Sequence, residues 1–182
     1  SPGALERTIA APFGEVPGQI EGNTLLSAPF NFAKRVRRGI DTNLDYNIGL
    51  GNDFKLSTNL KYSHVFQNSN YENPTLPDFE NRILSELGDP QDEFLWSVDL
   101  KKGPFTFGYE MHFIGPMYVG AYEDFNALQD RPPQDADASE IARFPSVFYH
   151  NIRFEWDMDK SGIAKNFLFY AGVDNLFNKT PP

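Results

Sequence analysis

The chain contains six segments in which apolar and polar residues alternate one by one. In the first, residues 40–50, the apolar residues Ile40, Leu44 and Ile48 alternate with polar residues such as Asn43 and Asn47. The same period of two residues recurs over residues 54–66, 94–101, 105–113 and 148–157, and from about 167 to 176. Such a period indicates β-strands with one apolar and one polar face. The pattern therefore predicts an all-β fold, an antiparallel up-and-down meander of about six strands.

The connections between these strands are alternately short and long. Short polar turns are predicted at residues 51–53, 102–104 and 159–162, and long connections at residues 67–92 and 115–145. The first long connection is expected to contain a short helix around residues 79–87, capped by Asp78. Apolar residues change from even to odd positions between Leu100 and Phe105. The turn between them should therefore contain an even number of residues.

The two faces of the predicted strands differ in charge. The apolar faces hold large aliphatic and aromatic residues without Asp, Glu, Lys or Arg, whereas the opposite faces carry both signs of charge. A soluble β-sandwich would share this alternation, but alternating short turns and long loops are typical of an outer-membrane barrel. The strands lack proline, and Tyr62, Trp96 and Trp156 are expected near strand ends, where an interfacial aromatic belt would place them. These features favour the barrel.

In the barrel interpretation, even-numbered residues of 40–62 and 94–100 face lipid. The short turns then lie in the periplasm and the long loops outside the cell. The predicted lumen-facing charges are Asp41, Lys55, Lys61, Arg153 and Glu155. We expect these side chains to hold an enclosed domain or neighbouring strands rather than to contact a substrate.

Composition narrows the function classes. The 182 residues are 40% hydrophobic, yet mean hydropathy is −0.47, so apolar residues are finely interleaved with polar ones. The net charge of −9 argues against a nucleic-acid partner. The absence of cysteine excludes disulfides and Cys-based zinc sites. No apolar run is long enough for a transmembrane helix.

Three segments resemble the C-terminal part of the barrel of a TonB-dependent receptor. They are RRGIDTNLDYNIGL (37–50), LGDPQDEFLWSVDLKKGPFTFGYEMHFIG (87–115) and YAGVDNLFNKTPP (170–182). The resemblance covers residues 33–182. The VDNLFNK stretch is its most specific part, and the order and spacing of the three segments agree with the family.

The resemblance implies a barrel of 22 strands in the outer membrane of a Gram-negative bacterium. Such a barrel encloses an N-terminal plug, whose TonB box contacts TonB and couples transport to the proton-motive force. The implied function is active import of a scarce nutrient, such as a siderophore, a cobalamin-like compound or an oligosaccharide. The implied partners are outer-membrane lipid, the rest of the receptor, TonB and a small-molecule ligand. A passive porin or a structural barrel without energy coupling remains the alternative.

The resemblance also implies a domain organisation. Residues 33–182 are expected to be the C-terminal portion of the barrel, without the plug and the closing strand. Residues 1–32, rich in glycine and proline, are expected to be an extracellular loop region. Because six strands cannot close a barrel, the chain is expected to be a fragment. Its last strand should pair with residues 148–156 on one side and with a further segment on the other.

One group of loop residues is a candidate ligand-binding vestibule. Tyr118, Tyr122, Phe125 and Arg131 would offer stacking faces and a cation to a sugar, a catechol or a carboxylate. Alternatively, these aromatic side chains pack the loop on itself.

Other candidate chemistry is weakly supported. Three histidines, His64, His112 and His150, lie on three different strands, and no spacing brings them together as a metal site. The acidic loop at residues 135–140 lacks the ligand spacing of a calcium site. No nucleophile elbow or phosphate loop is present. We expect no catalysis, no cofactor and no metal site.

Overall fold

The computed structural model describes residues 34–181, so the predicted loop region of residues 1–32 lies outside the described part. One short helix, α1 (Tyr122–Phe125), lies within it, and no helix there is long and apolar enough to cross a membrane. The strands are β1 (Lys34–Gly51), β2 (Phe54–Tyr71), β3 (Asn81–Arg82), β4 (Asp92–Lys102), β5 (Phe105–Ile114), β6 (Met117–Tyr118), β7 (Arg143–Phe144), β8 (Val147–Asp157) and β9 (Leu168–Val173).

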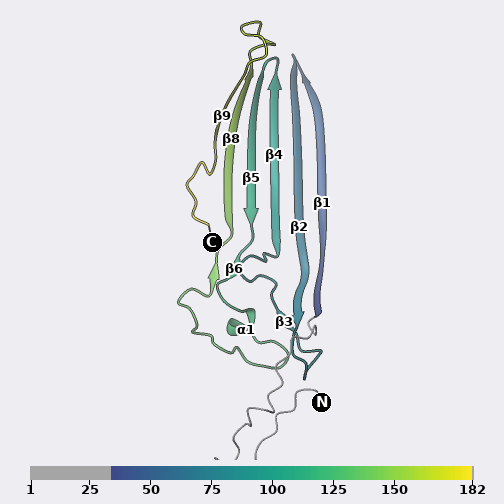
Figure 1. Ribbon diagram of the computed structural model, residues 1–182, viewed down its shortest axis with the longest axis vertical. Coiled ribbons are helices and arrows are strands. Elements are labelled where there is room, and N and C mark those ends of the chain that lie inside the picture. The colour runs from purple at the N-terminus through teal and green to yellow at the C-terminus, as the bar shows by residue number, and fades with distance from the viewer. Residues whose placement is uncertain (1–33, 182) are drawn as a thin grey trace, which may run out of the picture. The chain divides into compact units, whose positions relative to one another are not determined.

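Six strands form one antiparallel meander, in the order β1-β2-β4-β5-β8-β9. The short strand β3 pairs with the end of β2, and β6 and β7 form a separate two-stranded sheet. Figure 1 shows the six long strands side by side, with β3, β6 and α1 gathered at one end of the sheet. In the described residues β1 and β9 are the edge strands. The predicted all-β meander of about six strands is therefore confirmed.

Two of the short turns have the chemistry that the sequence indicated. Asn52 and Asp53, between β1 and β2, both have positive φ (50° and 64°), as a type I′ turn requires. Gly103 has a φ of 54° and is followed by Pro104, an arrangement that fits a type II′ turn. The β4–β5 turn therefore contains two residues, the even number expected from the change of parity. Apolar positions, even in β4 and odd in β5, consequently share one face.

β1 and β2 extend further than the sequence indicated. Each has 18 residues, and their ladder continues to the pair Lys34–Tyr71, past the expected ends at Ile40 and Phe66. A β-bulge divides the ladder, because Gly39 pairs with Val65 while Arg38 pairs with Gln67. The extra residue, Phe66, shifts the parity of β2. The alternation of apolar and polar residues in β2 is therefore interrupted at Phe66. For this reason the sequence pattern did not reveal that β1 and β2 continue beyond the bulge.

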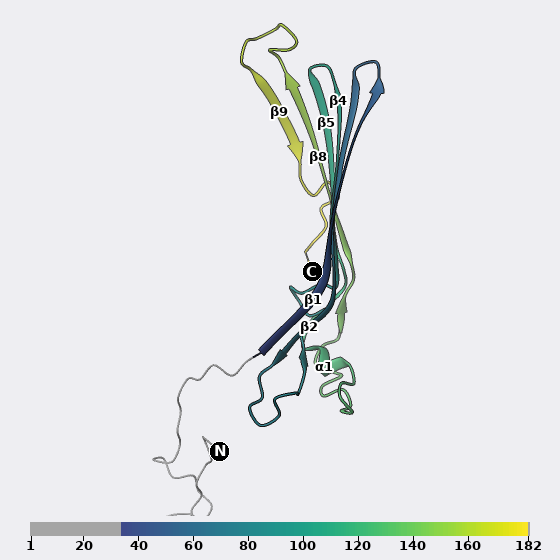
Figure 2. The same ribbon diagram turned by 90° about the vertical axis from the view of Figure 1, so that its right-hand side faces the viewer.

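The meander is a single layer, seen nearly edge-on in Figure 2. Its apolar face is exposed to an unusual extent: Leu44 is 59% exposed, Phe107 49% and Phe169 44%. Cross-strand pairing assigns the following residues to this face: Ile40, Leu44, Ile48, Leu56, Leu60, Phe94, Trp96, Val98, Leu100, Phe105, Phe107, Tyr109, Met111, Phe113, Phe148, Ile152, Phe154, Trp156, Phe169 and Val173. On β4 this face carries charge only at the strand ends, at Asp92 and Lys102.

Both tryptophans of the apolar face donate their indole N–H to a nearby side-chain hydroxyl. Trp96 lies near the middle of β4 and not, as expected, near its end. Its indole Nε1 donates to Thr58 Oγ1 at 2.9 Å, and Thr58 Oγ1 donates to the Ser97 carbonyl at 3.0 Å. Trp156, which does lie near the end of its strand, donates to Ser161 Oγ at 2.8 Å.

The buried core lies where the two long connections meet β2, and not between sheet layers. Among the described residues the buried apolar side chains are Val65, Leu84 and Met117. The predicted helix at residues 79–87 is wrong: Asn81 and Arg82 pair with β2, and the backbone N–H groups of residues 83 and 84 donate to the Asn68 carbonyl. A helix of about two turns is marginal by itself, and these tertiary bonds replace it. The second connection, expected to be irregular, contains β6, α1 and β7.

The C-terminal hairpin differs from the prediction in two respects. The connection from β8 to β9 covers residues 158–167 and is longer than the predicted turn at 159–162. β9 pairs with β8 as expected, but ends at Val173 instead of 176. Two positions further on, Asn175 adopts positive φ and its N–H donates to the Asn151 side chain at 2.8 Å. At this position the side-chain oxygen of Asn151 therefore takes the place of a backbone acceptor of β8.

The β1–β2 bulge gives a test of the fold. A Cβ at Gly39 would lie 2.6 Å from the His64 carbonyl oxygen, whereas nothing lies within 4 Å of a Cβ at Gly49. We expect Gly39→Ala to lower the free energy of unfolding by about 1–3 kcal/mol through the forced backbone shift. The matched variant Gly49→Ala should be close to neutral. Urea unfolding in detergent measures both, and equal effects would contradict the close approach at the bulge.

Candidate functional site

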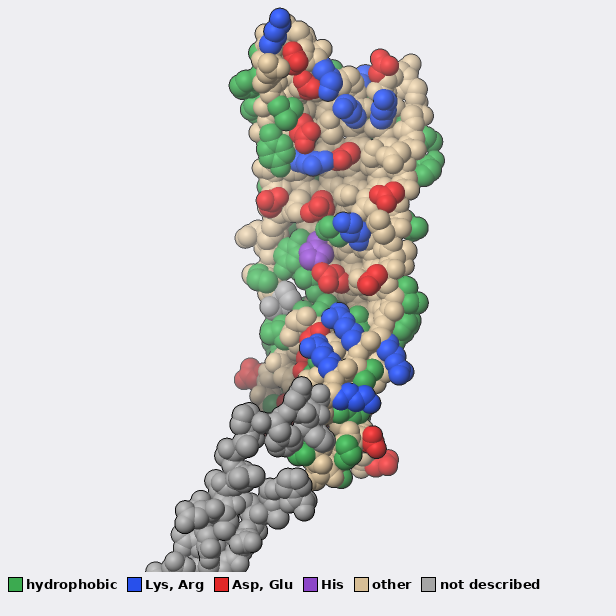
Figure 3. Space-filling model, turned by 45° about the vertical axis from the view of Figure 1, so that its right-hand side comes forward, with side chains coloured by type: hydrophobic (Ala, Val, Ile, Leu, Met, Phe, Trp, Pro, Cys, Tyr) green, Lys and Arg blue, Asp and Glu red, His purple; other side chains and the backbone are tan. Residues whose placement is uncertain are grey.

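The polar face of the sheet carries the five charged residues predicted to share a side. Cross-strand pairing assigns Asp41, Lys55, Lys61, Arg153 and Glu155 to this one face. Figure 3 shows a face on which acidic and basic side chains are distributed along the strands, with apolar side chains mainly at the margins. Arg153 and Glu155 come together, with Arg153 Nη1 3.8 Å from Glu155 Oε1. The other three side chains lie apart from this pair, on β1 and β2.

An ion pair across β5 is the central feature of the polar face. Arg153 Nη2 on β8 donates to both carboxylate oxygens of Asp99 on β4, each at 2.7 Å. Gly108 of β5 lies between them and pairs with both residues. A Cβ at Gly108 would lie 2.5 Å from Arg153 Cγ and 2.8 Å from Asp99 Oδ1. The glycine therefore leaves the space through which the two side chains meet.

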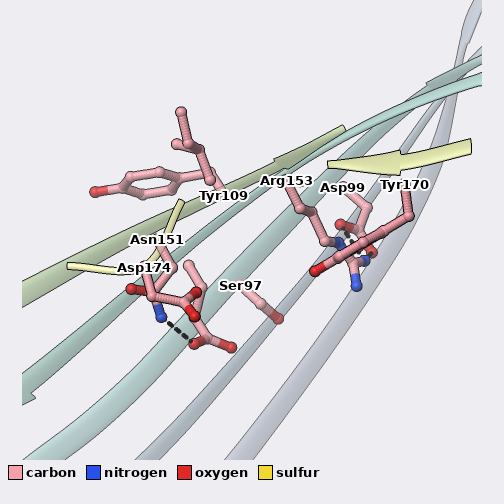
Figure 4. Close-up of a pocket in the computed structure, with 10 residues that line it drawn as sticks. Ser97, Asp99, Tyr109, Asn151, Arg153, Tyr170 and Asp174 are labelled. Carbon is pink, nitrogen blue, oxygen red and sulfur yellow. Dashed lines mark hydrogen bonds and ion pairs between the residues drawn. The ribbon is translucent and has the colours of Figure 1, made fainter. Parts of the chain in front are cut away.

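A polar pocket of about 310 Å³ surrounds this ion pair. Figure 4 shows Tyr170 beside Arg153 and Asp99, and Asn151 and Asp174 further along. Asn151 Nδ2 donates to Glu110 Oε1 at 3.0 Å. Because Asp99 already neutralises Arg153, the carboxylates of Glu110 and Asp174 leave the pocket net negative. The pocket is therefore suited to a cationic or hydroxyl-bearing group.

Most residues of this pocket were not identified from the sequence. The sequence placed Asp99, Glu110 and Arg153 on the charged face but named only Arg153 as a site residue, and its partner Asp99 lies 54 positions away. The cross-strand register that joins them depends on the long connection between β5 and β8. One signal was present: a glycine inside a strand, such as Gly108, often marks the close approach of another group.

The two long connections pack on each other to form a compact cap. The Tyr118 N–H donates to the Ser85 carbonyl at 2.7 Å, and the Tyr122 N–H donates to Glu86 Oε1 at 2.9 Å. The side chain of Asn68, 1% exposed, donates to Asp89 Oδ1 at 2.7 Å and accepts from Arg35 Nε at 3.1 Å. These bonds join β1, β2 and both connections, so the cap is attached to one end of the sheet.

Three of the four predicted vestibule residues lie together in the cap. The Tyr118 ring stacks on Phe125 with centroids 6.0 Å apart and meets Tyr122 edge-on at 5.5 Å. Arg131 is separate from them, with its guanidinium 3.8 Å from the centroid of the Phe79 ring. These aromatic side chains pack on one another, in line with the alternative interpretation that they stabilise the loop.

Burial and like charges perturb one carboxyl group of the cap. Burial raises the pKa of Glu86 above its ordinary value, the Tyr122 N–H acts in the opposite direction, and the nearby charges of Glu123, Asp89 and Asp124 raise it further. Glu123 is itself 9% exposed, and its Oε2 has no hydrogen-bond partner in the described residues. The cap thus concentrates negative charge around a buried segment.

The three histidines each contact a different polar partner. His64 Nδ1 lies 2.6 Å from Asp92 Oδ1, His112 Nε2 lies 2.7 Å from Glu93 Oε1, and His150 Nδ1 lies 2.7 Å from the Tyr109 hydroxyl. Within residues 34–181, no group of three or more His, Asp or Glu side chains is arranged to hold a metal ion.

Comparison of the chain with protein-family models, with curated proteins and with solved structures finds no match.

The raised pKa of Glu86 predicts a pH-dependent cap. Because the folded cap binds this proton more tightly than the unfolded chain, cap stability should fall as pH rises from the ordinary value of 4.5 through the raised pKa. Hydrogen exchange of the Tyr122 amide, corrected for its intrinsic rate, measures this change. Glu86→Gln should remove the pH dependence, and Glu140→Gln, at an exposed position of the second connection, should retain it. A pH profile unchanged in Glu86→Gln would contradict the assignment.

Proposed function

We propose that this chain forms part of the wall of a TonB-dependent receptor in the outer membrane of a Gram-negative bacterium. The observation that carries the proposal is the exposed apolar face of a single-layered sheet. In a water-soluble domain such a face would be covered by a second layer. A patch of this size marks an interaction surface, and a lipid bilayer is the surface that matches its extent and lack of charge.

The length of the uncharged region agrees with the thickness of a membrane. On β4 the apolar face is free of charge between Asp92 and Lys102. The ten steps between them, at about 3.3 Å each, span about 33 Å, which a strand tilt of about 40° reduces to about 25 Å across the membrane. That value is the height of the apolar band of outer-membrane barrels. The indole N–H groups of Trp96 and Trp156 are bonded to protein hydroxyl groups, which also suits an environment without water.

The open edges of the sheet extend the proposal to a closed barrel. In hydrocarbon every backbone N–H and C=O must be paired, so β1 and β9 would pair with further strands. The resemblance of residues 37–50, 87–115 and 170–182 to TonB-dependent receptors supports a total of 22 strands. The polar face then lines the lumen and contacts the plug, and the cap stands on the extracellular side.

In such a receptor the plug couples transport to TonB. The proposed activity is import of a siderophore, a cobalamin-like compound or an oligosaccharide. The negative polar pocket beside Arg153 and Asp99 lies on the lumenal face in this arrangement, where it contacts the plug. The family resemblance, with its VDNLFNK stretch, supports an energy-coupled importer over a passive porin.

Lipid contact is tested by placing a charge on each face of β1. Leu44 lies opposite Leu60 on the apolar face, and Asn47 lies opposite Ser57 on the polar face. Leu44→Arg should cost about 2–4 kcal/mol near the bilayer midplane, whereas Asn47→Arg should be tolerated. The measurement is the yield with which the intact receptor that contains this chain folds into lipid vesicles, scored by resistance to protease. Equal yields for the two variants would exclude the lipid-facing assignment.

Energy coupling is tested with the intact receptor in cells. Uptake of three labelled probes, a ferric hydroxamate, a cobalamin and an oligosaccharide, is compared between cells with and without the receptor. The receptor-dependent uptake of one probe should vanish when a protonophore collapses the proton gradient. Uptake that persists would support a passive porin, and the absence of receptor-dependent uptake for every probe would contradict import of these three ligand classes.

A further inference from the structure

We call the uncharged part of the apolar face the apolar band. A second pocket lies on the same side of the sheet, where β1 and β2 continue past the end of this band. Its volume is about 280 Å³, and Arg38, Phe66, Gln67, Glu80 and Arg82 line it. It lies beside the β1–β2 bulge, at the junction between the sheet and the cap.

Strand pairing determines the face on which the two arginines lie. β1 alternates without interruption, so Arg38 shares the apolar face with Ile40, which is 55% exposed. Arg82 pairs with Ser69, and Ser69 pairs with Val36, the next residue of β1 on that face. Both arginines are therefore on the side that carries the apolar band, just beyond its end.

The charge of the pocket is not neutralised from within. In residues 34–181 neither Arg38 nor Arg82 forms an ion pair, and Arg82 Nε is buried without a hydrogen-bond partner. The Arg82 guanidinium stacks on the Tyr122 ring at 4.4 Å. The carboxylate of Glu80 accepts a hydrogen bond from the Ser69 hydroxyl. Two cations and one bonded carboxylate make the pocket positive in a chain of net charge −9.

The surroundings of the pocket are amphipathic. Phe66, 56% exposed, lines the pocket, and Ile40 follows on the apolar face. Lys34, two positions beyond Val36 on the same face of β1, adds positive charge on the side away from the band. Positive side chains are thus followed along the strands by apolar ones. A ligand that matches this arrangement has an anionic head and apolar chains that lie along the strands. A free anion would use the arginines but not the exposed Phe66 and Ile40.

We propose that this pocket binds the phosphate group of a membrane lipid with an anionic headgroup, with the guanidinium groups of Arg38 and Arg82 on the phosphate oxygens. Guanidinium groups bind phosphate through paired, charge-assisted hydrogen bonds. The acyl chains lie against Phe66 and Ile40. This inference rests on the proposed function, because it requires the apolar face to lie in lipid. It adds a specific lipid site at the edge of the membrane, where the cap begins.

The test uses the intact receptor that contains this chain, purified in a non-ionic detergent, and measures lipid binding by native mass spectrometry. The probes are phosphatidic acid, phosphatidylcholine with the same chains, glycerol 3-phosphate and inorganic phosphate. The variants are Arg38→Gln, Arg82→Gln and the double variant. The matched control is Arg37→Gln, because Arg37 lies in the same basic segment but on the opposite face of β1.

We expect phosphatidic acid to bind about tenfold more tightly than phosphatidylcholine, with a loss of roughly tenfold for each arginine removed, as for one charge-assisted hydrogen bond. Arg37→Gln should bind like the parent protein. Equal binding of the two lipids, or equal loss in Arg37→Gln and Arg38→Gln, would overturn the proposal. Glycerol 3-phosphate or inorganic phosphate binding as tightly as phosphatidic acid would show a free-anion site and would also overturn it.

Folding into vesicles of pure phosphatidylcholine separates this inference from the proposed function. If the protein inserts but does not prefer phosphatidic acid in the binding measurement, the lipid site is excluded and the barrel proposal stands. Failure of the intact receptor that contains this chain to insert contradicts the barrel itself. Because Arg82 also packs on Tyr122, exchange protection of the Tyr122 amide in Arg82→Gln shows whether the cap is intact. If Arg82→Gln disturbs the cap, the lipid binding of Arg38→Gln decides the proposal, because Arg38 lies at an exposed position.

Discussion

The cross-strand register is the constraint on which the rest of this structure depends. Side chains on a strand alternate with a period of two, so a slip of one residue would exchange the faces of a whole strand. The register keeps Leu44, Leu60 and Trp96 in one row and places Asp99, Gly108 and Arg153 in another row on the opposite face. This register produces the apolar band on one face and the polar pocket on the other, with one layer of backbone between them.

The sheet cannot be explained by burial of its own apolar residues. Leu84, Val65 and Met117 are buried at the junction with the cap, whereas residues such as Leu44 remain exposed on the band. The hydrophobic effect within the described chain therefore stabilises the cap more than the sheet. Hydrogen-bonded ladders hold the sheet together, and a surrounding apolar phase would supply the burial that the chain itself does not. For this reason the lipid-facing assignment, the barrel and the lipid-phosphate pocket form one connected set of proposals.

The cap and the sheet have different physical characters. The sheet repeats the alternation of apolar and polar residues. Each row of side chains consists of residues that face one another on neighbouring strands. The cap is irregular and depends on particular bonds, such as Tyr122 to Glu86 and Asn68 to Asp89. It also holds carboxylates close together, so protonation should affect the cap. A loop region of this kind can vary in structure while the strands below keep their register.

The sequence by itself determined the strands, two of the turns and the two faces, because a period of two residues and the Gly-Asn-Asp and Gly-Pro turns are local signals. It could not show the extension of β1 and β2, because the bulge at Phe66 shifts the parity, nor the cap, because its bonds join segments far apart in the chain. The partners of the candidate residues were also decided by tertiary structure. Arg153 meets Asp99 only because Gly108 leaves space between them, and Arg131 stacks on Phe79 instead of joining Tyr118. Alternation of residues specifies a face, but the contacts within that face depend on which strands become neighbours.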